Sequence, residues 1–116
     1  MGTQEIDMTP SNFNQQQKIL LFRDTHDRAY NKAHTASLYY VILNTDDPKL
    51  IGNMLVNYFT IAYDKYELFR VIYEDTKEDV DRLTMLRDKL VWCLKEIDEE
   101  TELINLLREA FDEMME

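Results

Sequence analysis

Glycine, proline and cysteine are scarce in this chain, and each scarcity narrows the class of protein that it can be. The 116 residues include two glycines, two prolines and one cysteine. Sheet proteins with many tight turns use far more glycine and proline, so the composition favours an all-α fold. A lone cysteine excludes an intramolecular disulfide and a cysteine-rich zinc site, and we interpret Cys93 as a small buried apolar residue.

Segments that direct a protein to or across a membrane are also missing from the sequence. No apolar run reaches about 18 residues, no charged stretch followed by an apolar one resembles a signal peptide, and no Asn-x-Ser/Thr glycosylation acceptor occurs. Hydrophobic residues make up 45% of the chain, which is enough for a folded core. We therefore expect one cytoplasmic domain without membrane contact, in the host cytoplasm if the protein is viral.

Negative charge is concentrated in the C-terminal third of the chain. Residues 1–70 carry 7 Lys and Arg against 8 Asp and Glu, whereas residues 71–116 carry 6 against 15, so the net charge of −10 divides into −1 and −9. The same third has the most regular apolar spacing, which indicates an ordered acidic helix and not a disordered tail. The basic residues are scattered and outnumbered, so we expect no direct binding to nucleic acid.

Apolar spacing and helix caps predict three long helices. Residues 1–10 have no periodicity and are interpreted as a flexible arm, followed by a single helical domain at residues 11–116. The helices are expected at about 11–44, 48–74 and 77–115. The first helix has a stripe at spacings of 3 or 4: Phe22, His26, Ala29, Ala33, Ala36, Tyr40 and Leu43. The alanines in this stripe would let a neighbouring helix approach closely.

The second predicted helix is apolar over most of its circumference. Its second apolar stripe, about 80° round from the first, includes Tyr63, Tyr66 and Tyr73. Tyrosine suits either a bundle core or an oligomer interface, because a buried ring keeps a hydroxyl for a hydrogen bond. These three tyrosines are therefore candidates for a dimer or core stripe.

The third predicted helix has a heptad repeat, and only one of its ten seam positions is charged. The a and d positions are Leu83, Leu86, Leu90, Cys93, Ile97, Glu100, Ile104, Leu107, Phe111 and Met114. Ile104, Leu107 and Phe111 extend the expected dimer or core stripe. At Glu100 we expect the helix to bend or to leave its partner helix.

The lengths of the predicted helices indicate a dimer. At 1.5 Å per residue the third helix would be about 58 Å long and the second about 40 Å, so part of the third would be uncovered. A second copy of the chain is the simplest cover. The expected fold is therefore all-α, a bundle of three long helices completed by homodimerisation.

Three apolar residues, Met85, Trp92 and Leu106, lie on the side of the third predicted helix opposite the heptad seam. Two interpretations remain open. They are buried in a larger bundle, or they form a partner surface anchored by Trp92, since tryptophan often contributes a large share of an interface's binding energy.

The acidic residues outside the seam form a second candidate partner surface. A rigid array of carboxylates can compete with phosphates for a basic groove on another protein. The residues assigned to this acidic face are Asp88, Glu96, Asp98, Glu99, Glu102, Glu109, Asp112 and Glu113. The alternative is that they form a solvated face that serves solubility.

Two carboxylate pairs provide the one enzyme hypothesis. Glu99-x-x-Glu102 and Glu109-x-x-Asp112 resemble the ExxE and ExxD elements of the all-α MazG-like nucleotide pyrophosphohydrolases, a family that holds magnesium between helices. The resemblance covers these two tetrapeptides and implies magnesium-dependent nucleotide hydrolysis. In that family the pairs lie on different helices, whereas here they lie ten residues apart on one predicted helix.

No other residues form a catalytic or metal-binding pattern. His26 and His34 are eight residues apart, and neither has a second His or Cys at metal-ligand spacing. We therefore expect no catalytic residues, metal or cofactor. The favoured function is stoichiometric binding to a protein partner, including a nucleic-acid-binding protein, as an adaptor, assembly factor or inhibitor. The size and acidity of this chain resemble those of small phage-encoded inhibitors and assembly factors.

Overall fold

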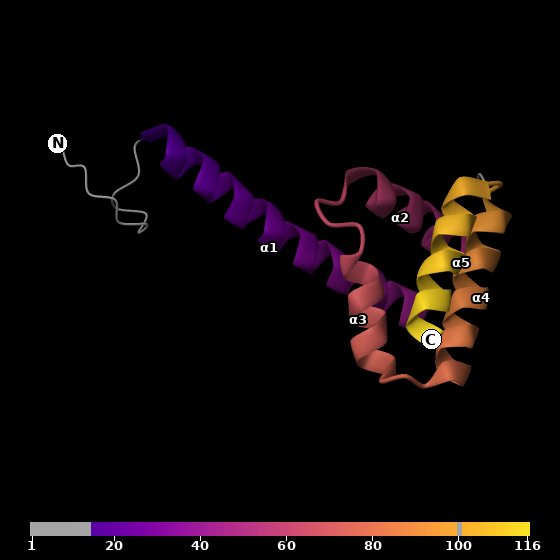
Figure 1. Cartoon of the computed structure of the whole chain (residues 1–116). Coiled ribbons are helices and arrows are strands. Elements are labelled where there is room, and N and C mark those ends of the chain that lie inside the picture. The colour runs from indigo at the N-terminus through magenta and orange to yellow at the C-terminus, as the bar shows by residue number, and fades with distance from the viewer. Residues whose placement is uncertain (1–14, 100) are drawn as a thin grey trace.

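The computed structural model describes residues 15–99 and 101–116, and this part of the chain consists of helices and short connections (Figure 1). The predicted all-α fold is confirmed. The helices are α1 (Gln15–Asn44), α2 (Pro48–Ile61), α3 (Glu67–Thr76), α4 (Val80–Glu96) and α5 (Thr101–Met115). The prediction of three long helices was wrong for the described residues, because the second and third predicted helices are each divided in two. The predicted arm at residues 1–10 lies outside the described residues.

The core lies among α2, α3, α4, α5 and the C-terminal half of α1. Its fully buried side chains include Leu38 and Ile42 of α1, Tyr58 of α2 and Phe111 of α5. Aromatic rings connect the elements, since Phe69 of α3 lies with its ring centroid 6.1 Å from that of Phe111 in an edge-to-face arrangement. The burial of Leu38 and Ile42 fixes the C-terminal half of α1 to the body.

The second predicted helix ends at Ile61 because a side chain from α1 captures the backbone after it. The Asn31 amide nitrogen donates to the Asp64 carbonyl oxygen at 3.2 Å, and the Asp64 N–H donates to the Asn31 amide oxygen at 3.0 Å. The Asp64 carboxylate accepts hydrogen bonds from the Tyr66 N–H and from Arg70. Aspartate often bonds to its local backbone in this way in competition with the helix, and here the chain turns into α3.

The third predicted helix folds back between α4 and α5. Asp98 has a left-handed backbone conformation with φ of 55°, the Glu99 N–H donates to the Leu94 carbonyl at 3.0 Å, and the Asp98 N–H donates to the Lys95 carbonyl at 3.1 Å. These two bonds form a Schellman motif, which ends a helix at a left-handed residue. As a result α4 and α5 lie side by side (Figure 1). The expected overhang does not exist, because α5 packs on the core of its own chain.

The six residues predicted as one dimer or core stripe separate into two groups. Ile104, Leu107 and Phe111 of α5 are buried in the core. The side chains of Tyr63, Tyr66 and Tyr73 are exposed, with 54%, 55% and 36% of their surface accessible. The break after Ile61 explains the difference, because Tyr63 and Tyr66 leave the helix whose apolar face they were expected to extend. Glu100 lies outside the described residues.

A glycine sets the distance between α2 and α4. A Cβ atom at Gly52 would lie 2.6 Å from the carbonyl oxygen of Cys93, on the backbone of α4, and 3.1 Å from the Ile97 side chain. Cys93 itself is fully buried, as expected for a seam residue. No side chain larger than glycine's hydrogen fits between these helices unless one of them moves.

We therefore predict that Gly52→Ala destabilises the protein. Alanine gains about 1 kcal/mol of helix propensity over glycine, but forcing α2 away from α4 costs about 1–3 kcal/mol or more. The expected result is a net loss in the free energy of unfolding, measured by urea denaturation. Asn53→Ala, at the exposed neighbouring position of α2, is the control and should cause no loss. A Gly52→Ala variant as stable as the unaltered protein would contradict the close contact.

Candidate protein-interaction surfaces

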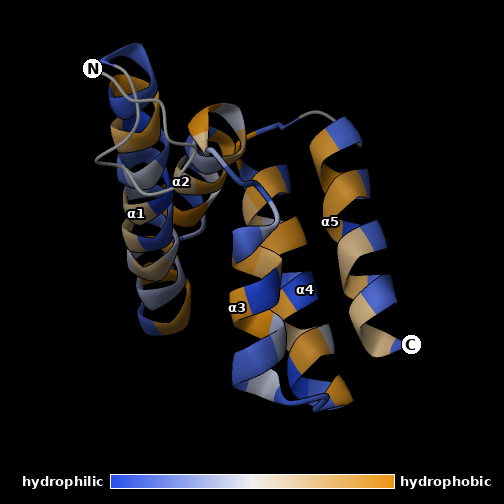
Figure 2. Cartoon of the chain, turned by 60° about the vertical axis from the view of Figure 1, so that its left-hand side comes forward, coloured by the Kyte–Doolittle hydropathy of each residue, from blue (hydrophilic) through white to orange (hydrophobic). Residues whose placement is uncertain are grey.

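The N-terminal half of α1 projects away from the rest of the protein (Figure 1). Residues 15–30 are all exposed except Asp24, which is half-buried. Large apolar side chains are included, since Phe22 is 69% exposed, Leu20 is 54% exposed and Ile19 is 50% exposed. Hydropathy colouring shows apolar bands along this helix between polar ones (Figure 2). An isolated helix of this length is marginal in water, so the projecting half is a candidate binding element.

The stripe predicted on the first helix is the uncovered face of α1. Every member is exposed: Phe22, His26, Ala29, Ala33, Ala36, Tyr40 and Leu43. We call these seven residues the outer stripe. The buried face of α1 lies about 150° away at 100° per residue and contains Asn31, Thr35, Leu38, Tyr39 and Ile42. The outer stripe is therefore directed away from the core.

Polar contacts on the buried face fix the direction of α1. The Thr35 hydroxyl lies 2.8 Å from the Tyr58 hydroxyl, which also donates to the Asp64 carbonyl. The Lys89 ammonium donates to the Ile42 carbonyl at 2.6 Å, which connects α4 to the last turns of α1. These contacts hold the outer stripe at a defined position on the molecule.

Tyr39 adds a hydrogen bond that joins α1 to α3. Its hydroxyl donates to the Asp75 carboxylate at 2.6 Å, and the same carboxylate pairs with Arg82 of α4 at 3.0 Å. Burial raises the pKa of Tyr39 above its ordinary value, and the hydrogen bond to Asp75 raises it further. The folded state therefore retains a proton that the unfolded state releases at ordinary tyrosine pKa. Stability supplied by Tyr39 is present below about pH 10 and is lost as the pH rises above it.

We predict that Tyr39→Phe lowers the free energy of unfolding by about 1 kcal/mol at pH 7, because one hydrogen bond to a carboxylate is lost. The difference from the unaltered protein should shrink between pH 10 and about pH 11. Urea denaturation at several pH values measures both effects. Tyr66→Phe removes the hydroxyl of an exposed tyrosine and is the matched control. Its free energy of unfolding at pH 7 should equal that of the unaltered protein. A Tyr39→Phe difference that grows with pH would contradict this role.

The structure places the predicted acidic face in three locations. Glu102, Glu109, Asp112 and Glu113 are exposed on the outer side of α5, within about 100° of arc. Glu96, Asp98 and Glu99 lie where α4 ends and the chain turns toward α5. Asp88 lies apart from both groups on α4, where it pairs with Arg87 at 3.1 Å. The negative charge of the C-terminal third is thus carried mainly by α5 and the turns, because α4 contains four basic and three acidic residues.

The predicted apolar surface is only partly assembled. Met85 and Trp92, two turns apart on the exposed side of α4, are 63% and 45% exposed. Leu106 belongs to α5 and packs partly buried against the core. The fold-back of α5 places Leu106 on a different helix from the other two residues. Met85 and Trp92 remain as a candidate apolar contact.

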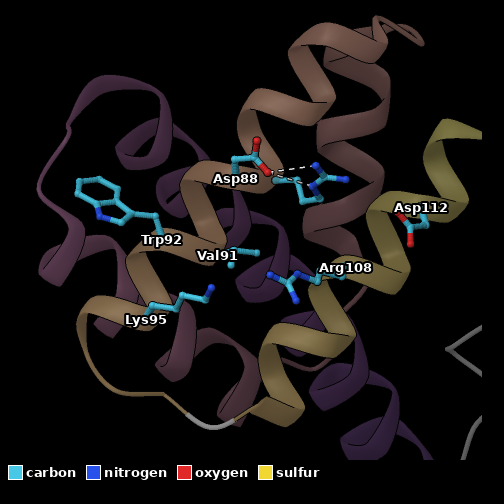
Figure 3. A pocket seen from close by; sticks show the side chains of 7 residues that line it. Asp88, Val91, Trp92, Lys95, Arg108 and Asp112 are labelled. Atoms are coloured by element: carbon cyan, nitrogen blue, oxygen red, sulfur yellow. Dashed lines mark hydrogen bonds and ion pairs between the residues drawn. The ribbon is translucent and has the colours of Figure 1, made fainter.

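A groove of about 410 Å³ lies between α4 and α5 and was not predicted from the sequence. It is lined by Arg87, Val91 and Lys95 from α4 and by Arg108 from α5, with Asp88, Trp92 and Asp112 at its edges (Figure 3). Lys95 and Arg108 point toward one another, and neither forms an ion pair with a residue that the structure describes. The Trp92 ring points away from α5. Lys95 and Arg108 therefore form a local positive patch beside Trp92, the predicted anchor. The patch exists because α5 folds back on α4, which the sequence did not predict.

The carboxylate pairs that resemble the MazG-like elements lie on α5 and in the turn that precedes it. Glu102, Glu109 and Asp112 are exposed on α5, and Glu99 is half-buried in the turn before it. Among residues 15–99 and 101–116, no three His, Cys, Asp or Glu side chains are grouped so that they could hold a metal ion. His26 lies exposed 3.8 Å from Asp27, and His34 packs against the Tyr58 ring.

Comparisons with models of known families, with curated proteins and with solved structures give no match. Among the described helices, none is long and apolar enough to cross a membrane.

Proposed function

We propose that this chain is a non-enzymatic protein-binding protein that acts stoichiometrically as a homodimer in the cytoplasm, as an adaptor, assembly factor or phage-type inhibitor. The observation that supports this proposal is the exposed apolar surface of α1. Phe22, Tyr40 and Leu43 are exposed, and the N-terminal part of the helix extends beyond the body (Figure 1). Contiguous exposed apolar residues mark interaction sites more often than isolated ones do.

The outer side of α5 is the proposed surface for a different protein. Glu102, Glu109, Asp112 and Glu113 carry four charges on less than four turns of helix, with Arg108 as the one basic residue of α5. Spaced carboxylates on a rigid helix attract a basic surface of the kind that binds phosphates. The proposed partner is therefore a nucleic-acid-binding protein, and nucleic acid would compete with this chain for it.

The proposal is tested by capturing the partner from the native host with the tagged full chain and then measuring the purified complex. We predict that Glu102→Lys with Glu109→Lys weakens binding at least tenfold, since like charges then face each other across the interface. Affinity of the unaltered chain should also fall steeply as salt rises, because exposed charges are screened over about 10 Å at 0.1 M ionic strength. Surface plasmon resonance at several salt concentrations measures both.

A matched variant separates local charge from net charge. Glu74→Lys with Asp81→Lys makes the same change in net charge on exposed residues of α3 and α4, and it should leave affinity within about twofold. Trp92→Ala distinguishes the other candidate surface, since an interface anchored by Trp92 would lose about 2 kcal/mol or more and depend little on salt. Equal losses from both charge-reversed pairs would contradict the proposed acidic face, and so would a loss confined to Trp92→Ala.

A further inference from the structure

We propose that the outer stripe of α1 binds the same stripe of a second copy of this chain, with the two helices antiparallel and the two-fold axis near Ala33. This inference rests on the homodimer proposed above and identifies its interface. The stripe lies on the side of α1 directed away from the core, so a partner there would leave the buried face of α1 packed as it is among the described residues. The occupant is inferred from the size and charge of the residues along the helix.

The sizes of the side chains are self-complementary in this arrangement. The middle of the stripe is small, with Ala29, Ala33 and Ala36, and the ends are large, with Phe22 at one end and Tyr40 and Leu43 at the other. When two helices cross antiparallel at Ala33, residues equally far from it in sequence face each other. Alanines then meet near the axis, and His26 faces Tyr40 of the other copy. Contact over 22 residues corresponds to about 33 Å of helix.

Charge favours the antiparallel over the parallel arrangement. Helix α1 contains four Lys and Arg and two Asp, so it is net positive in a chain of net charge −10. The antiparallel arrangement brings Lys18, near the start of α1, toward the C-terminal end of α1 in the other copy, where the helix dipole favours a cation. Parallel pairing in register would instead place Lys18 beside Lys18 and align the two helix dipoles. The antiparallel arrangement also directs the acidic bodies to opposite ends.

The first test is the molar mass of the full chain by light scattering at tens of micromolar protein. The unaltered chain should have twice the mass of 13.9 kDa that one copy has. Ala33→Glu should have the mass of one copy, because two glutamates would meet at the axis. Ala33 is exposed in the single chain, so circular dichroism should remain unchanged. Gln16→Glu makes the same change in charge at an exposed position about 100° from Ala33, and it should remain dimeric.

A monomeric unaltered chain overturns this inference, and so does a dimeric Ala33→Glu variant. Neither result bears on the acidic face, because its test measures a complex with a different protein. A stoichiometric host protein that binds the outer stripe of a monomeric chain would likewise overturn the inference in favour of another occupant.

The second test determines the register by disulfide formation. Mixed His26→Cys and Tyr40→Cys chains should form a crosslinked heterodimer under mild oxidation. Each variant alone should remain uncrosslinked, because two copies of residue 26 lie about 21 Å apart along an antiparallel pair. Cys93 is fully buried, and the unaltered chain is the control for its reactivity. Crosslinking of His26→Cys to itself would overturn the antiparallel arrangement.

Discussion

The hydrogen bonds between the Asn31 amide and the backbone of Asp64 determine most of the architecture. They bring together segments 33 residues apart in sequence. They hold the chain at the point where α2 has ended and α3 is about to begin, and they fix α1 against both. Asn31 is 3% exposed, and loss of such a buried amide would leave the N–H and carbonyl of Asp64 without these partners, at a cost of about 1–3 kcal/mol. The direction of the projecting helix depends on this contact.

The same contact explains why α1 has two different faces. Its buried face combines Asn31 and Thr35 with Leu38 and Ile42, so polar groups specify the position of the helix while apolar ones supply the burial. The outer stripe is then left exposed from Phe22 to Leu43. In the proposed dimer this stripe is buried by its copy, while the acidic side of α5 remains available to a different protein. Self-association and partner binding would therefore use separate surfaces.

Sequence patterns predicted the helical class and most buried seam positions, and they failed where distant residues decide the structure. Leu83, Leu90, Leu107 and Phe111 are buried as the heptad predicted. The apolar spacing still faces the core after α5 folds back, because α4 and α5 are each helical. The end of α2 was missed because it depends on Asn31 in another helix. The stripe of α1 was recognised, but the sequence could not show that the opposite face, which contains Asn31 and Thr35, would pack on the core. The cationic groove requires Lys95 and Arg108 to meet across an unpredicted turn.

Hydrogen exchange in the projecting half of α1 tests the central claim most directly, namely that a second copy covers this helix. Residues 15–30 are exposed apart from Asp24, which accepts a hydrogen bond from Tyr63, so a single copy should exchange the amides of this segment rapidly by local unfolding. The account predicts protection of these amides at tens of micromolar protein, and loss of that protection on dilution and in Ala33→Glu, with α4 protected throughout. Amides of residues 15–30 that exchange equally fast at every concentration, while α4 stays protected, would contradict it.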